Sequence, residues 1–115
     1  MNVIFMTMNE LRAEDLPFVQ RTVKVQNPYG LHMRPASVFV KVAMKLKSTV
    51  QIRKNEKVVN GKSLMSMITL AAQQGTELEL MVHGEDALQA IDILATILGS
   101  PSTEGLENLL LPKSS

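Results

Sequence analysis

The sequence predicts an α+β fold in which a four-stranded antiparallel sheet is covered on one face by three helices. Four short segments show the period-2 alternation of half-buried strands. Three further segments show the 3.6-residue period of amphipathic helices. The segments follow one another in the order β-α-β-β-α-β-α, which suits an open-faced sandwich whose helices bury their apolar stripes on the sheet.

The strand segments end at recognisable turns. The first strand stops at the loop Asn27-Pro28-Tyr29-Gly30, whose residues favour turns. Lys54-Asn55-Glu56 separates two β-branched runs and predicts an antiparallel hairpin. The four expected strands are residues 19–25, 49–53, 57–59 and 77–82.

The helical segments carry start and stop signals. Pro35 suits a first helical turn, and Ser63 is a candidate N-cap for a short apolar helix that closes near Gly75. Acidic residues are expected in the first turn of the last helix, which Gly99 ends. The expected helices are 35–46, 64–71 and 85–98, and the buried stripe of the last one is Ala87, Leu88, Ile91, Leu94 and Leu98.

The chain of 115 residues is 45% hydrophobic, which is sufficient for one continuous core. We expect an N-terminal extension over residues 1–18, a folded domain over 19–99 and a C-terminal tail over 100–115. The first residues lack the basic and apolar regions of a secretory signal. No apolar run approaches the roughly 20 residues of a membrane span, so a soluble, cytoplasmic protein is expected.

Composition excludes several classes of site. Cysteine is absent, so disulfides, thiolate metal sites and cysteine nucleophiles are excluded. Gly61-Lys62-Ser63 is not a phosphate-binding P-loop, since Glu56 stands where that motif requires glycine. Residues 21–62 contain ten Lys/Arg and a single acidic residue, which indicates either a basic face for acidic protein partners or scattered solvated lysines. Few aromatic residues accompany these charges, and we expect no nucleic-acid binding.

The segment Gly30-Leu31-His32-Met33-Arg34-Pro35-Ala36 places a histidine and an arginine at the entry to a helix. The first N–H groups of a helix have no internal partner and attract anions. A neutral imidazole there can act as a nucleophile, while Arg34 and the helix N-terminus offset the charge of a phosphoryl group. Spacing alone leaves open a second interpretation, a capping or surface histidine beside an unrelated arginine.

This segment resembles the active-centre signature of the HPr family, the histidine-containing phosphocarriers of the bacterial sugar phosphotransferase system. Three later blocks resemble the family in the same register, and the resemblance runs from Val19 to Leu98. It departs from the common form in its two terminal segments and in Met33, where a small residue is frequent. The later blocks are Lys62-Ser63-Leu64-Met65, Gln74-Gly75-Thr76-Glu77 and Gly84-Glu85-Asp86-Ala87.

The resemblance implies a phosphoryl carrier and not a small-molecule enzyme. His32 would accept a phosphoryl group on its δ nitrogen from phosphorylated enzyme I and pass it to enzyme II A components, with Arg34 stabilising the group in each transfer. No cofactor, no metal and no membrane contact are implied, and a monomer is expected.

The resemblance also identifies Ser63 as a regulatory phosphorylation site for an HPr kinase/phosphorylase, whose product is read by a transcriptional regulator. Its structural role, capping the short helix, is compatible with this one. Apolar residues near the two helix starts are expected partner contacts, although core filling is an alternative for each methionine. These residues are Met33, Leu64, Met65 and Ile68.

Two other functions fit the same residues. The chain can be a regulatory module that acts chiefly through phosphorylated Ser63. It can also be the carrier of a nitrogen-related phosphorelay, with the same chemistry at His32 but different partners. The sequence does not separate these from sugar transport.

Overall fold

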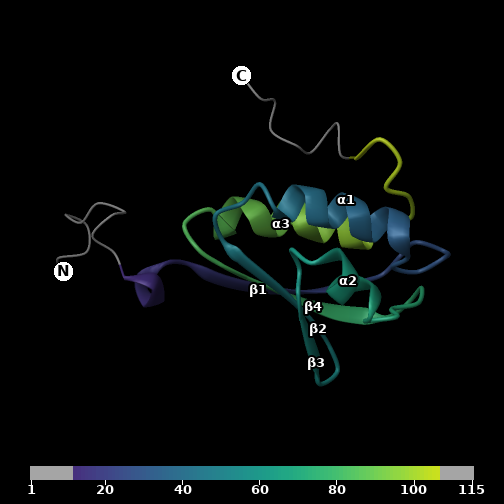
Figure 1. The fold of residues 1–115 in the computed structure, drawn as a ribbon, viewed down its shortest axis with the longest axis horizontal. Helices are drawn as coiled ribbons and strands as arrows, with labels where there is room; N and C mark the ends of the chain where they lie inside the picture. Colours follow the sequence, from purple (N-terminus) through teal and green to yellow (C-terminus); the bar gives the residue numbers. More distant parts are fainter. Residues whose placement is uncertain (1–11, 107–115) are drawn as a thin grey trace.

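A computed structural model of the protein describes residues 12–106 and confirms the predicted α+β class (Figure 1). The order of strands and helices is the predicted β-α-β-β-α-β-α, preceded by a short 3-10 turn. The elements are η3 (Ala13–Asp15), β1 (Phe18–Lys24), α1 (Met33–Ala43), β2 (Thr49–Lys54), β3 (Lys57–Asn60), α2 (Leu64–Ile68), β4 (Glu77–His83) and α3 (Ala87–Gly99).

The four strands form one antiparallel sheet in the order β1-β4-β2-β3. The last strand, β4, lies between β1 and β2, so that Phe18 and Thr49 both pair with His83. All three helices lie on one side of the sheet (Figure 1). The hairpin predicted at 54–56 is a tight turn in which Lys54 pairs with Lys57.

The core lies between the sheet and the helices and is almost entirely aliphatic. Phe39 is the only aromatic side chain buried in it among the described residues, because Phe18 and Tyr29 are exposed. Burial alternates along β2 and β4, as the period-2 pattern predicted, whereas β1 and β3 each bury a single residue, Val23 and Val59. Fully buried side chains include Phe39, Ile52, Met67, Leu70, Leu78, Leu80, Leu94 and Ile97.

The first two helices differ from the predicted bounds at their ends. The N-cap of α1 is His32, and its first internal bond joins the N–H of Ala36 to the His32 carbonyl at 3.0 Å, so the helix begins before Pro35. Helix α2 ends at Ile68 because the backbone turns away at Ala71, whose φ is +49°. Sequence periodicity cannot detect such a turn, since alanine ordinarily favours a helix.

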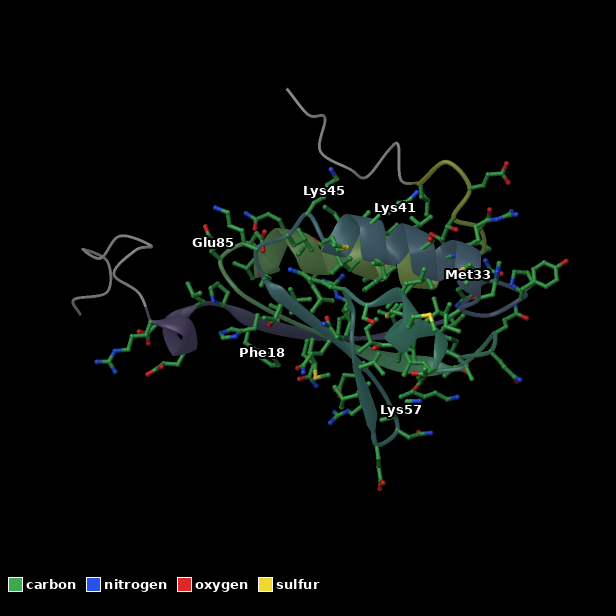
Figure 2. The ribbon with its side chains drawn as sticks, in the orientation of Figure 1. Phe18, Met33, Lys41, Lys45, Lys57 and Glu85 are labelled. Carbon is green, nitrogen blue, oxygen red and sulfur yellow. The ribbon has the colours of Figure 1, made fainter. Side chains whose placement is uncertain are left out.

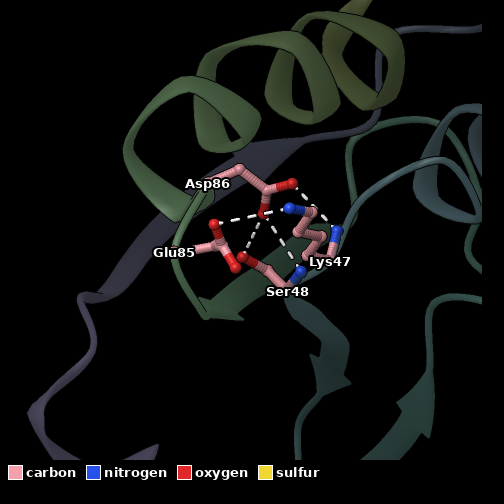
Figure 3. Close-up of polar contacts among 4 residues, drawn as sticks. All are labelled: Lys47, Ser48, Glu85 and Asp86. Atoms are coloured by element: carbon pink, nitrogen blue, oxygen red, sulfur yellow. Dashed lines mark hydrogen bonds and ion pairs between the residues drawn. The ribbon is translucent and has the colours of Figure 1, made fainter. Parts of the chain in front are cut away.

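The start of α3 was predicted wrongly. Glu85 and Asp86 precede the helix, and the Asp86 carboxylate accepts the N–H groups of Lys47 at 2.8 Å and of Ser48 at 3.0 Å, together with the Ser48 hydroxyl (Figure 3). Gly84 allows this approach, because a Cβ at its φ of +151° would lie 2.5 Å from the Cα of Ser48. These acidic residues therefore hold the loop between α1 and β2.

Leu88 was also predicted wrongly as part of the buried stripe of α3, since 61% of its surface is exposed. It follows Ala87, which is buried, and adjacent helical residues point about 100° apart. Ile97 is buried in addition to the other predicted residues of the stripe, Ala87, Ile91, Leu94 and Leu98.

The basic and acidic halves of the sequence meet in the folded chain. Three surface ion pairs join them, namely Arg21 to Asp92 at 2.7 Å, Lys47 to Glu85 at 3.6 Å, and Arg53 to Glu79. The charge asymmetry of the sequence is thus partly neutralised by folding, and part of the expected basic face is lost.

The extension expected over residues 1–18 and the tail expected over 100–115 fall largely outside the described residues. Within the described part, η3 precedes β1, and the N–H of Gly84 donates to the Pro17 carbonyl at 3.0 Å. No helix between residues 12 and 106 is both long and apolar enough to cross a membrane.

We expect Asp86→Ala to lower the free energy of unfolding by about 1–3 kcal/mol at neutral pH, because buried Ser48 loses its acceptor. Partial burial alone would raise the pKa of Asp86, but the hydrogen bonds from Ser48 and Lys47 outweigh burial and lower it. The stabilisation is therefore present above the pKa of an unfolded Asp, about 3.9, and is lost as the pH falls through the folded-state pKa.

Urea denaturation at neutral and acidic pH measures this difference. Asp92→Ala is the control, since it removes only an exposed ion pair and should cost about 0–1 kcal/mol. A difference for Asp86→Ala that is the same at both pH values would contradict a contribution from the ionised carboxylate.

Candidate functional site

His32 occupies the N-cap position of α1, with the extended backbone angles φ −89° and ψ −170°. Its side chain makes no capping hydrogen bond, so the imidazole does not satisfy the helix N–H groups. The ring is half-buried, which leaves it accessible to a partner. Of the alternative interpretation from the sequence, a capping or surface histidine, the capping role is therefore wrong.

The loop before His32 is held by a close approach between two backbone segments. Gly30 has φ +74°, and a Cβ there would lie 2.5 Å from the carbonyl oxygen of Ala72. That carbonyl accepts the N–H of Leu31 at 2.8 Å, and the N–H of Gly30 donates to the Asn27 carbonyl at 2.8 Å. Only glycine fits this position without strain. The entry to α1 is thus attached to the loop that follows α2.

The start of α1 offers two N–H groups to an anion. Ala36 makes the first internal bond and Pro35 has no N–H, so the N–H groups of Met33 and Arg34 remain, and neither has an acceptor among residues 12–106. The dipole of an eleven-residue helix adds partial positive charge at this end. The site combines a nucleophilic ring with donors for negative charge.

Arg34 and three further residues of α1 extend the site along one face of the helix, on which Val38 is buried and Arg34 is exposed. They follow the spacing 34, 37, 38 and 41, which places side chains on one helix face. The guanidinium of Arg34 has no carboxylate within ion-pair distance between residues 12 and 106. An open depression of about 440 Å³ is lined by His32, Met33, Arg34, Ser37, Val38 and Lys41.

Tyr29 contacts the His32 ring and was not predicted as part of the site. The two ring centroids are 6.0 Å apart and the rings are perpendicular, although 84% of the Tyr29 surface is exposed. The N–H of Tyr29 donates to the Asn27 side chain at 2.9 Å, which fixes the backbone below the ring. The sequence held no signal for this contact, because the left-handed turn at Gly30 creates it.

Ser63 is the N-cap of α2, as predicted, and its hydroxyl accepts the N–H of Ser66 at 3.2 Å. Gly61 lets this turn lie against the core, since a Cβ there would be 2.6 Å from a methyl group of Val50. Helix α2 contacts α1. Met33, at the N-terminal end of α1, and Glu85 lie at opposite ends of the molecule (Figure 2).

The predicted apolar contacts differ in exposure. Met33 and Met65 are 56% and 75% exposed, whereas Leu64 and Ile68 are half-buried against the core. Met67 on the same short helix is fully buried and fills the core. A five-residue helix therefore presents some apolar side chains outward, as the sequence indicated.

Other candidate sites are weaker. A second depression of about 460 Å³, near β2 and β3, is lined by residues that include no histidine and no carboxylate. The other histidine, His83, packs edge-on against Phe18 at the far end of β1. No group of three potential metal ligands occurs in the part of the chain that the structure describes.

Comparison with known proteins identifies the family of the chain. Residues 19–100 match the protein family described as the PTS HPr component phosphorylation site. The chain belongs to the HPr family. Among its relatives, the phosphocarrier protein HPr of Buchnera aphidicola is 46% identical over 79 residues, which are 69% of this chain and 93% of that protein.

Two further HPr-family proteins are similar. The HPr-like protein Crh of Bacillus subtilis is 43% identical over 77 residues, covering 67% of this chain and 91% of Crh. The crystal structure of HPr from Bacillus anthracis superposes with a TM-score of 0.68 at 36% identity, covering 70% of this chain and 96% of that one. The open-faced sandwich is therefore the fold of the family.

Replacing Tyr29 with Leu should shift the NMR resonances of the His32 ring, because the adjacent aromatic ring is lost. Stability should change by less than about 0.5 kcal/mol, since Tyr29 is largely exposed. Tyr29→Phe keeps the ring and should leave the His32 signals nearly in place. The His83 signals serve as an internal reference. Unshifted His32 resonances in Tyr29→Leu would contradict the contact.

Proposed function

We propose that the protein carries a phosphoryl group on His32 between enzyme I and enzyme II A components, in the manner of its family. The observation that supports this most is the position of His32. Its imidazole makes no capping hydrogen bond and lies beside N–H groups at the start of α1 that have no acceptor among residues 12–106. The protein acts as a monomeric carrier without cofactor or metal, within a relay that serves sugar uptake.

The transfer follows from the residues at the helix start. The lone pair of the His32 δ nitrogen attacks the phosphorus, a P–N bond forms, and the bond to the donor breaks, with the leaving group keeping its electrons. Arg34 and the N–H groups at the start of α1 face the charge on the phosphoryl oxygens. The reverse attack by a nucleophile of the acceptor returns His32 to its free state.

Replacing His32 with Ala should abolish phosphoenolpyruvate-dependent labelling by enzyme I and leave the fold intact, since the side chain makes no capping bond. The test is mass spectrometry of the chain after incubation, before and after acid treatment. His83→Ala is the matched control and should label fully, because His83 lies at the far end of β1. Labelling of His32→Ala that equals the wild type would refute the proposed acceptor.

Replacing Arg34 with Lys should slow transfer roughly tenfold, because an ammonium cannot make two directed bonds to a phosphoryl group. The melting temperature should not change, since Arg34 is exposed. Rapid-quench measurement of labelling at two salt concentrations checks this. Equal rates for both proteins at both concentrations would show that Arg34 acts only as a general positive charge.

We further propose that Ser63 is a regulatory phosphorylation site for an HPr kinase/phosphorylase, and that a transcriptional regulator reads its product. Ser63 begins the helix that carries exposed Met65, so a phosphate there would place a dianion at an apolar docking surface. Met33, Leu64, Met65 and Ile68 supply that surface. The negative charge of the phosphate would repel acidic partners that dock on this surface.

Ser63→Asp should therefore accept phosphate at His32 more slowly, although the His32 centre is unchanged. Stability should change by less than about 1 kcal/mol, since Asp is an acceptable N-cap. Ser63→Ala is the control, because it removes the cap without adding charge. The rate of labelling by enzyme I and the melting temperature are measured for the wild type and for both variants. An unchanged rate in Ser63→Asp would rule out a shared docking surface.

A second function is supported by the similarity to Crh, which is described as HPr-like. In that case the chain acts chiefly as a regulatory module through phosphorylated Ser63. A nitrogen-related phosphorelay would use His32 in the same way with other partners. Labelling of His32 by enzyme I, followed by transfer to sugar-specific or nitrogen-related acceptors, distinguishes the three.

A further inference from the structure

Helix α2 has only five residues, and a helix of this length is not stable by itself in water. Its position must come from tertiary contacts. Met67 anchors one side of it in the core, and the N-terminal side is attached where the Lys62 ammonium donates to the Leu46 carbonyl at 2.8 Å. Beyond the C-terminal end of α2, the side chain of Leu70 is buried in the core, and the carbonyl groups there have polar partners of their own.

The carbonyl groups at that end accept hydrogen bonds from two lysines of the β2–β3 hairpin. The ammonium of Lys57 donates to the Thr69 carbonyl at 2.9 Å. The ammonium of Lys54 donates to the carbonyls of Leu70 at 3.0 Å and Ala71 at 3.3 Å. Three consecutive carbonyls therefore face two positive charges.

The two ammonium groups lie close to each other, which is unfavourable unless the carbonyls accept their hydrogen bonds. Lys54 and Lys57 are direct cross-strand partners at the end of the hairpin, where like charges repel. No carboxylate lies within ion-pair distance of either ammonium among residues 12–106. Cations at the C-terminal end of a helix are stabilised by its free carbonyls, which offsets the repulsion.

Ala71 supports the same geometry at a conformational cost. Its φ of +49° lies in the left-handed region, which an alanine adopts only under constraint. In this conformation both Leu70 and Ala71 direct their carbonyls to the Lys54 ammonium. A strained residue that is held by charged hydrogen bonds indicates a position that the surrounding structure determines strongly.

We propose that Lys54 and Lys57 form a clamp that fixes α2 in place, and that they are positioning residues for partner docking. Figure 2 places Lys57 on the hairpin, below α2. The inference rests on the proposed function, in which the α2 surface with Met65 and Ser63 meets enzyme I. The two lysines act through α2 and not on the His32 centre.

Loss of the clamp should affect binding more than chemistry. Without it, the C-terminal end of α2 frays, and Met65 and Ile68 lose their fixed orientation. A partner must then order these side chains on binding, which weakens association. The His32 centre on α1 is unchanged, so the rate within the complex stays the same.

The test compares Lys54→Met, Lys57→Met and the double variant with the wild type. Methionine keeps an unbranched apolar stem without the ammonium. Lys24→Met is the matched control, since Lys24 is an exposed cation of β1 outside the clamp. The variants Lys54→Arg and Lys57→Arg keep a cationic donor and should restore the wild-type behaviour.

Two measurements are made on each protein. Amide hydrogen exchange at Thr69, Leu70 and Ala71 should accelerate roughly tenfold in the double variant, as expected for the loss of charge-assisted hydrogen bonds. In labelling by enzyme I, KM should rise about fivefold with kcat unchanged. Lys24→Met should show neither effect.

Unchanged exchange at these three amides in the double variant would overturn the clamp. Accelerated exchange with an unchanged KM, or a fall in kcat in place of a rise in KM, would overturn the positioning role. Failure of the proposed function appears separately, as absence of labelling in the wild-type chain. The exchange measurement needs no enzyme I, so it decides the clamp in either case.

Discussion

The end of the molecule that carries His32 depends on the close approach of the Gly30 backbone to the Ala72 carbonyl. A side chain at position 30 would collide with that carbonyl, and the left-handed φ of Gly30 is needed to bring the chain into α1. The same carbonyl accepts the N–H of Leu31. One contact thus determines where α1 starts, where its free N–H groups point and how Tyr29 meets the His32 ring. It also attaches the His32 segment to the loop after α2.

This attachment relates the two helix starts of the proposed docking surface. His32 occupies the N-cap position of α1 without a side-chain cap, Ser63 caps α2, and the two helices contact each other. The loop after α2 that receives Gly30 begins just beyond the carbonyls held by Lys54 and Lys57. The hairpin lysines therefore bind the carbonyls that follow α2, while a separate carbonyl, that of Ala72, holds the entry to α1. A disturbance at the hairpin has a physical route to the surface around Ser63.

Folding divides the positive charge of the sequence into groups with different partners. Arg21, Lys47 and Arg53 pair with carboxylates of the acidic half. Lys54, Lys57 and Lys62 donate to backbone carbonyls. The cations of the α1 side, which include Lys41 and Lys45, point away from the sheet (Figure 2). Fewer cations are therefore left without such partners than the number of lysines in the sequence suggests.

The sequence by itself determined the element order, the aliphatic core and the place of His32, Arg34 and Ser63 at helix starts. Periodicity and capping preferences act over a few residues, so the sequence displays them directly. Tertiary structure alone decided that Asp86 binds the loop before β2, that Leu88 is exposed and that Ala71 ends α2. It also brought Tyr29 to His32 and the hairpin lysines to α2. The exposure of Leu88 depends on how α3 is rotated against the sheet. The other features arise from backbone turns at Gly30, Ala71 and Gly84 or from contacts between residues far apart in the sequence. Local sequence patterns contain no information about these turns or these contacts.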